Sequence, residues 1–306
     1  MRYHLILKNM SVLNASAYNN YYVMGMPALT SFNGFTDKLK RVIESITNKS
    51  IVSTSYSIIT HDYKFNNSKE KHVKYMNIEG SKFDKPPSNK DEFKCNFVTS
   101  MLINIDFEDN DDLDFDLDES DFSLFSFEDN IQEALYTLRV AGGEIENTNS
   151  FLSIVNNDEN LLRELKKLDR GFFISDAQDK LDEYTELFDG DVLRAIIHMS
   201  ALFEKEDTSS EKYEAKGWER AGEGWLTPTS IGYVQINSQP IEGNEGARDI
   251  HPLYYVEPLT SMVEYIYLNR ILRKVTDDVM SSLIENKVVF TSVFEDNTYK
   301  IISKGE

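Results

Sequence analysis

NASAYNNYYVMGMPALTSFNGF, residues 14–35, decides how the first part of this chain folds. Its first half is rich in Asn and Ser, whose side chains hydrogen-bond the nearby backbone in turns. Gly25-Met26-Pro27 then interrupts any regular structure, and proline is well tolerated at the first position of a helix. The sequence therefore predicts a turn that leads directly into a helix with Pro27 at its start.

The apolar residues after Pro27 recur at steps of three and four, as in a helix with one buried face. They are Leu29, Phe32, Phe35, Leu39, Val42, Ile43 and Ile46. Strands are predicted over 2–8, 51–61 and 93–105, where apolar or β-branched residues alternate. Residues 62–91 predict a long loop or a protruding hairpin. This order of elements is typical of half a ferredoxin-like fold.

The rest of the chain alternates between helical and strand patterns. Helices are predicted over 127–139, 158–168, 177–188 and 192–203, and strands over 230–237 and 288–294. A break is expected at Ala141-Gly142-Gly143, because paired glycines allow positive φ or close backbone approach. We expect an α+β fold with an RRM-like core (1–145) carrying a long hairpin or thumb, a helical insertion (146–225), and return strands that complete the core (226–306).

The formal net charge of −20 argues against a conventional nucleic-acid-binding surface, which is usually basic. Half of this charge lies in residues 106–121, where ten Asp and Glu residues occur without Lys or Arg. We interpret this acidic run as a solvated loop, with a surface that docks a partner or mimics DNA and a cation site as alternatives. An RNA site on this chain must then be a small basic or neutral patch.

The residue types that hold metals and cofactors do not cluster in the sequence. Cys95 is the only cysteine, the five histidines share no short metal-ligand spacing, and the P-loop and dinucleotide-binding motifs are absent. No metal and no cofactor is therefore expected. No apolar run is long enough to cross a bilayer, so we expect a cytoplasmic protein.

Candidate RNA contacts gather around the start of the first helix. The N–H groups there attract phosphate without any net positive charge, and hydroxyl, amide and guanidinium groups add donors. The candidates are Asn14, Ser16, Thr30, Ser31, Asn33, Arg41 and Arg248, and the residues expected to shape the backbone are Gly25, Pro27, Gly34, Gly142 and Gly143. The amides of Asn19 and Asn20 are expected to be uncommitted, and Tyr233 is expected in the core.

Short motifs occur in a fixed order along the chain: NASA (14–17), GMPALTSFNGF (25–35), RVAGGEI (139–145), GW (224–225), GY (232–233) and ARD (247–249). Together they resemble the crRNA 5′-handle-binding subunit of the type I-F CRISPR surveillance complex, also called the Csy complex. The family pattern NANA becomes NASA in this chain, with Ser16 in place of asparagine.

The resemblance implies a RAMP-type ferredoxin-like fold and a noncatalytic subunit that holds the crRNA 5′ handle. It also implies three partners beside the RNA: the large Csy subunit, the Csy backbone subunit, and target DNA within the assembled complex. Two alternatives stay open. One is a metal-independent RAMP endoribonuclease that uses His4 or His251, and the other is an acidic scaffold whose acidic run docks a basic protein.

Overall fold

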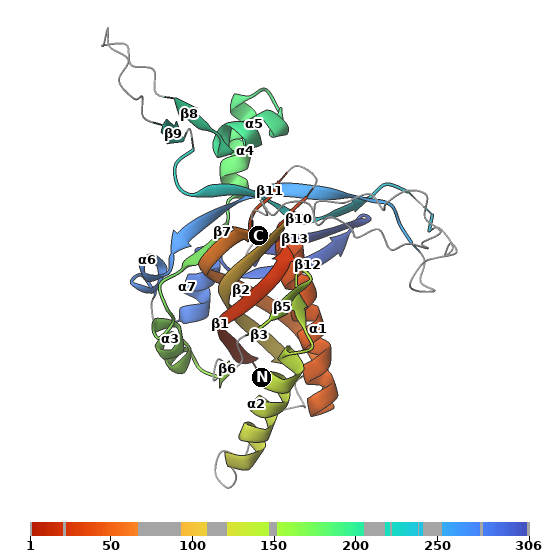
Figure 1. Cartoon of the computed structure of the whole chain (residues 1–306), viewed down its shortest axis with the longest axis vertical. Helices are drawn as coiled ribbons and strands as arrows, with labels where there is room; N and C mark the ends of the chain where they lie inside the picture. Colours follow the sequence, from red (N-terminus) through yellow and green to blue (C-terminus); the bar gives the residue numbers. More distant parts are fainter. Residues whose placement is uncertain are drawn as a thin grey trace, which may run out of the picture.

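The computed structural model describes residues 2–20, 23–66, 93–108, 121–146, 152–204, 218–220, 222–237, 239–240, 253–275 and 278–304 (Figure 1). The first elements are β1 (Arg2–Ser16), α1 (Leu29–Thr47), β2 (Ile51–Asn66) and β3 (Lys94–Phe107). β3 lies between β1 and β2 and pairs antiparallel with both. β1–α1–β2 is therefore a split βαβ unit, the ferredoxin-like arrangement that the sequence predicts.

The remaining elements follow in chain order. The helices are α2 (Asp121–Leu135), α3 (Asp158–Lys166), α4 (Gln178–Leu187), α5 (Val192–Ser200), α6 (Leu268–Leu272) and α7 (Val279–Glu285). The strands are β4 (Arg139–Val140), β5 (Gly143–Ile145), β6 (Leu152–Val155), β7 (Phe172–Asp176), β8 (Leu202–Glu204), β9 (Trp218–Arg220), β10 (Leu226–Gln235), β11 (Val256–Tyr267), β12 (Phe290–Glu295) and β13 (Thr298–Ser303).

Within the described residues, eleven strands form one antiparallel sheet. Their order is β12-β13-β10-β11-β7-β2-β3-β1-β5-β4, and β6 pairs with β1 beside β5. A further pairing joins Tyr56 of β2 to Phe290 of β12. The path β12-β13-β10-β11-β7-β2 therefore closes on itself, and β7 together with β12, from the last quarter of the chain, completes the edge of β2.

Helices cover both faces of the central strands. Alternate residues of β1 point to opposite faces: Leu5 and Leu7 belong to the buried cluster that includes the apolar face of α1, and Ile6 belongs to a second cluster with α3, α6 and α7. Figure 1 shows α1 and α2 on one side of the sheet and α3, α6 and α7 on the other. The result is a three-layer core with α1 packed directly against β2, β10 and β13.

A separate small cluster lies where α4 and α5 meet β10 and β11. Ala195 and Met199 of α5 are buried there with Leu226 and Met262. In Figure 1, α4, α5, β8 and β9 project together from the top of the sheet. In the described part of the chain, no helix is long and apolar enough to cross a membrane.

The α+β class and the ferredoxin-like order are confirmed, and several predicted boundaries are corrected. β1 continues to Ser16, so Asn14 and Ser16 lie in a strand and the predicted turn begins only after them. α1 begins at Leu29 with Ala28 as its N-cap, which places Pro27 outside the helix. Arg139 belongs to β4 and is not part of α2. The region 146–225 holds α3, α4 and α5, and also β6 and β7, which pair into the main sheet.

Candidate nucleic-acid interface

The end of β1 and the Ala141-Gly142-Gly143 segment are far apart in the sequence but adjacent in the structure. The backbone N–H of Ser16 donates to the carbonyl oxygen of Ala141 at 2.9 Å. Asn14 has a left-handed backbone (φ 55°), is exposed, and donates its N–H to Oδ1 of Asn96 at 2.9 Å. Asn14 therefore marks an irregularity in β1 that leaves its side chain at the surface.

Gly142 and Gly143 are glycines for two different physical reasons. Ala141 (φ 51°) and Gly142 (φ 76°) form the tight turn between β4 and β5. At Gly143, a Cβ would lie 2.8 Å from the Cβ of Ala15, the carbonyl oxygen of Leu13 and Cγ1 of Val12. Glycine is thus required at position 143, because β5 pairs with β1 at a distance that leaves no room for a Cβ there.

The loop between β1 and α1 is clamped onto the C-terminal half of the chain. Asn19 donates Nδ2 to Oγ1 of Thr229 at 2.9 Å, and its Oδ1 accepts the N–H of Ser230. Asn20 donates Nδ2 to Oγ1 of Thr260, also at 2.9 Å. The prediction that these amides are uncommitted is wrong, because both are used to hold the loop against β10 and β11.

The loop closes on itself before α1 begins. The N–H of Gly25 donates to the carbonyl oxygen of Ala17 at 2.9 Å, and a Cβ on Gly25 would meet nothing within 4 Å. Pro27 is buried just before the N-cap. Ala28 makes no side-chain cap, and the first turn of α1 carries no acidic residue. The positive end of the helix dipole is therefore neither capped by a side chain nor neutralised by a carboxylate in that turn.

The predicted contacts on α1 divide into two groups. Thr30 and Ser31 are half-buried in the first turn, and Arg41 is exposed. Asn33 is only 3% exposed, and its Nδ2 donates to Oδ2 of Asp37 at 2.9 Å and to the hydroxyl of Tyr299 at 2.6 Å. Asn33 therefore joins α1 to β13 inside the chain.

One continuous stripe of α1 faces outward. Thr30, Gly34, Lys38 and Arg41 follow one another at helical spacing, and the last three are exposed. A Cβ on Gly34 would meet nothing within 4 Å. We refer to these four residues as the α1 stripe. It combines an uncapped helix start, a gap without a side chain, and two positive charges.

Arg248 and the rest of the ARD motif lie outside the described residues, as do residues 109–120 of the acidic run. Asp106, the first acid of that run, is committed to the fold: Arg2 Nε lies 2.7 Å from its Oδ1, and Ser53 donates to its Oδ2 at 2.7 Å. Burial raises the pKa of Asp106, but the hydrogen bonds from Arg2 and Ser53 outweigh that effect and lower it. Asp106 is thus a paired carboxylate at the end of β3.

The histidines proposed for a ribonuclease are not equally placed. His4 is 3% exposed, and its Nδ1 lies 2.7 Å from Oδ1 of Asn104 on β3. Burial lowers the pKa of His4 despite that hydrogen bond. His251 lies outside the described residues. Among the described residues, no group of three or more His, Cys, Asp and Glu side chains is arranged to hold a metal ion.

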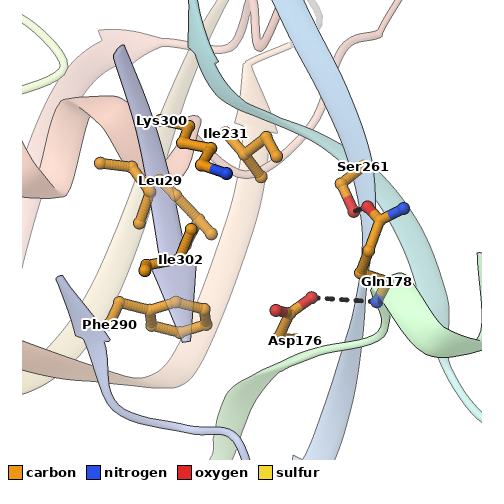
Figure 2. Close-up of a pocket in the computed structure, with 9 residues that line it drawn as sticks. Leu29, Asp176, Gln178, Ile231, Ser261, Phe290, Lys300 and Ile302 are labelled. Carbon is orange, nitrogen blue, oxygen red and sulfur yellow. Dashed lines mark hydrogen bonds between the residues drawn. The ribbon is translucent and has the colours of Figure 1, made fainter. Parts of the chain in front are cut away.

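A cavity of about 220 Å³ lies next to Leu29 at the start of α1, between the two halves of the sheet. Figure 2 shows Lys300 of β13 extending into it beside Leu29 and Ile231, with Asp176 and Gln178 on the opposite wall. Those polar groups bond to each other: Oδ1 of Asp176 accepts the N–H of Gln178 at 3.0 Å. The described lining residues include no histidine or cysteine.

The sequence reasoning missed an exposed aromatic groove near the far ends of β10–β13. Its volume is about 520 Å³, and it is lined by Tyr233, Gln235, Tyr254, Val256, Phe294, Asn297 and Tyr299. Tyr233, expected in the core, is 39% exposed. The signal was weak in the sequence, because each contributing segment supplies a single ring (Tyr233, Tyr254, Phe294 and Tyr299), and their common face follows only from the register of the strands.

A comparison with models of protein families matches residues 5–285 to a family described as CRISPR-associated protein (Cas_Csy2). The match spans nearly the whole chain and includes α1, β2, β3 and β1 from Leu5 onward. A search among curated proteins finds no match.

Proposed function

The chain belongs to the CRISPR-associated Cas_Csy2 family and is thus a type I-F Csy protein, and on that premise we propose that it is the noncatalytic subunit that holds the crRNA 5′ handle. In this role it pairs with the large Csy subunit and caps the filament of backbone subunits. It meets target DNA within the assembled complex, where base pairing with the guide supplies sequence specificity. The task of this chain is to fix the position of the guide.

The α1 stripe is the observation that carries this proposal. Glycine inside a helix costs roughly 0.5–1 kcal/mol relative to alanine. Gly34 occupies such a position, yet a Cβ there would touch nothing within 4 Å. The fold itself gives no reason for the missing side chain, whereas an RNA backbone lying close along α1 does. Lys38 and Arg41 extend the same stripe with two charges for phosphate.

The uncapped start of α1 adds a second attraction for phosphate. Backbone N–H groups and the helix dipole favour an anion at this end, and no carboxylate of the first turn competes. Thr30 and Ser31 supply hydroxyl donors beside it. This arrangement explains how a chain with a net charge of −20 can bind RNA through a local neutral-to-basic path.

A noncatalytic role is favoured by the position of His4. A general base must come within about 3 Å of the proton that it removes, directly or through one water. The His4 ring is buried against Asn104, on the same strand face as Ile6 and its cluster with α3, α6 and α7, so an RNA 2′-hydroxyl does not reach it in this fold. We therefore propose positional binding and no cleavage.

A protein partner is supported by the apolar surface of α5 and its neighbours. Leu193 is 64% exposed and Ile197 is 57% exposed, one turn apart on the same helix, and Leu187 and Leu202 are exposed beside them. A contiguous apolar surface of this kind is typical of a protein-docking site. We propose that it contacts the large Csy subunit, away from the α1 stripe.

The test is co-expression of the chain with a guide RNA and the candidate large subunit, followed by RNA binding measured against salt. The variant Lys38→Ala/Arg41→Ala removes two cations of the α1 stripe. Its matched control is Lys166→Ala/Arg273→Ala, which removes two exposed cations near α3 and α6, on the other side of the molecule (Figure 1). A third variant, Leu193→Asp, alters only the apolar surface of α5.

We expect the α1 double variant to bind RNA more weakly, with a salt slope shallower by about 1.4, since each phosphate contact to a single strand contributes about 0.7. The control double variant should keep the wild-type slope, and Leu193→Asp should lose the large subunit. Equal slopes for both double variants would contradict the assignment of the α1 stripe. Failure of the wild type to retain guide RNA would overturn the proposed function itself.

A further inference from the structure

The aromatic groove is built by strand register. Phe294 of β12 pairs with Tyr299 of β13, and Tyr299 pairs with Tyr233 of β10. Directly paired residues of an antiparallel sheet project from the same face, so these three rings form a row across three neighbouring strands. Two positions further along, Gln235 donates its backbone N–H to the carbonyl oxygen of Asn297, which sets a second row of amide side chains beside the first.

Because successive residues of a strand project from opposite faces, the glutamates that follow groove residues in β11 and β12 lie on the face opposite the groove. Glu295 follows Phe294, and Glu257 follows Val256, so both carboxylates project from the opposite face of the sheet. The described lining residues of the groove include no acid and no base. On a chain with a net charge of −20, the described lining of this groove holds no carboxylate that would repel phosphate.

The rings are exposed to different degrees. Phe294 is 67% exposed, Tyr254 is 44% exposed and Tyr233 is 39% exposed. Tyr299 is held more firmly, because its hydroxyl accepts a hydrogen bond from Asn33 at 2.6 Å. The row of rings is therefore accessible to solvent on a backbone that is fixed by strand pairing.

Asn33, which is 3% exposed, links Tyr299 of the groove to α1 from inside the chain. It precedes Gly34 in α1, and its amide contacts both Asp37 and Tyr299. Asp37 is the carboxylate nearest to this junction; burial raises its pKa, against the effect of Arg41 and Lys40. The groove therefore lies on the face of β13 against which α1 packs, next to the helix that carries the α1 stripe.

We propose that this groove binds unstacked nucleobases of the RNA held along α1. Phe294 and Tyr233 provide the stacking platforms, Asn297 provides its amide group for the base edges, and Gln235, whose Nε2 donates to the carbonyl oxygen of Asn237, provides its Oε1 as an acceptor. Single-stranded RNA is commonly held by aromatic side chains on a sheet, with backbone contacts beside them. This inference rests on the proposed function, because it names which part of the same RNA this surface takes.

The test compares two RNAs and three variants of the full chain. The probes are a fluorescein-labelled RNA with the sequence of the guide's 5′ handle, and the same phosphate backbone carrying abasic riboses. The variants are Phe294→Ala, Phe294→Leu and Phe294→Trp. The matched control is Trp225→Ala, which removes an aromatic ring that is 60% exposed at the other end of β10.

Loss of one base–aromatic stack should weaken Kd by about 5- to 150-fold. We expect that loss for Phe294→Ala and Phe294→Leu with the intact RNA, near wild-type binding for Phe294→Trp and Trp225→Ala, and no effect of any variant with the abasic RNA. Phe294 is mostly exposed, so these variants leave the core unchanged, which far-UV circular dichroism verifies.

The outcomes separate this inference from the proposed function. If the wild type binds intact and abasic RNA equally, and Phe294→Ala changes neither Kd, RNA binding stands and the groove assignment is overturned. If Phe294→Ala releases the large subunit while RNA binding is unchanged, the groove docks protein, which also overturns it. If the wild type binds neither RNA, the proposed function fails first, and this inference fails with it.

Discussion

Replacing Gly143 with alanine tests the close contact between β5 and β1. The added Cβ would lie 2.8 Å from the carbonyl oxygen of Leu13 and from the Cβ of Ala15. Neither atom belongs to a long flexible side chain, so β5 must move away from β1. Overpacking of this kind costs about 1–3 kcal/mol. The movement also weakens the short ladder in which Val12 pairs with Ile145 and Leu13 pairs with Glu144. We therefore expect the free energy of unfolding to fall by about 2–3 kcal/mol.

The matched control adds the same methyl group at Gly34. A Cβ there meets nothing within 4 Å, and the residue lies inside α1. Alanine is favoured over glycine in a helix by about 0.5–1 kcal/mol, so Gly34→Ala should stabilise the fold by that amount. One chemical change therefore has opposite expected signs at two glycines of the same set.

Urea unfolding followed by far-UV circular dichroism measures both variants against the wild type. The midpoints are compared with one shared value for the dependence of the free energy of unfolding on urea concentration. The two midpoints should move in opposite directions, and the free energies of unfolding of the two variants should differ by about 2.5–4 kcal/mol. A Gly143→Ala protein within about 0.5 kcal/mol of wild type would show that β5 does not approach β1 this closely. The reason given for Gly143 would then be wrong.

Two further perturbations address the loop clamp and the charge cluster of α3. Asn19→Ala should lower the free energy of unfolding by about 2–4 kcal/mol, since it removes hydrogen bonds to β10. The control Asn156→Ala, at an exposed position, should stay within about 0.5 kcal/mol of wild type. Equal urea midpoints for the two variants would show that Asn19 does not hold the loop against β10. Burial raises the pKa of Glu164, but hydrogen bonds from Lys167 and Lys8 outweigh it and hold that pKa at about 2, against 4.5 unperturbed. A depressed pKa adds stability above the unfolded value, so the advantage of wild type over Glu164→Gln should be full above pH 4.5 and vanish as pH falls toward 2; a pH-independent difference in urea midpoints would contradict it.

The elements with strong local patterns were predictable from the sequence. α1 has a continuous apolar stripe, and its buried residues Leu29, Phe32 and Leu39 are those that the periodicity selects. β3 alternates cleanly, and Cys95 is buried on it as a small apolar side chain. Burial raises the pKa of the Cys95 thiol to about 11, which fits that structural role.

The length of β1 was not predictable in the same way. Asn9 and Asn14 adopt positive φ, and the register with β3 shifts near both. Asparagine tolerates this conformation, which in sequence is the mark of a turn. In the structure the strand passes through both irregularities because β3 continues to pair on the far side of each.

The hydrogen-bond partners of the candidate site residues were not predictable from the sequence. Arg41 is exposed, but Pro27 is buried and Thr30 and Ser31 are half-buried. Asn19 and Asn33 bond to Thr229 and Tyr299, more than two hundred residues away. A local pattern carries no information about such partners. The aromatic groove has the same origin, since its rings share a face only after β12, β13 and β10 are paired.

The closure of β2 against β7 and β12 sets the order in which a newly made chain can finish folding. β1, β2 and β3 leave the ribosome early. β7, which pairs with Ile59 and Thr60 of β2, begins about 65 residues after the end of β3, but β12, which pairs with Tyr56, begins only about 180 residues after it. At about 5–20 residues per second, that delay is roughly 10–40 s. Throughout it the nascent N-terminal half presents an unpaired strand edge, the kind of surface that seeks another chain. Truncated forms of this protein should therefore aggregate, and efficient production should depend on a chaperone or on slow synthesis at low temperature.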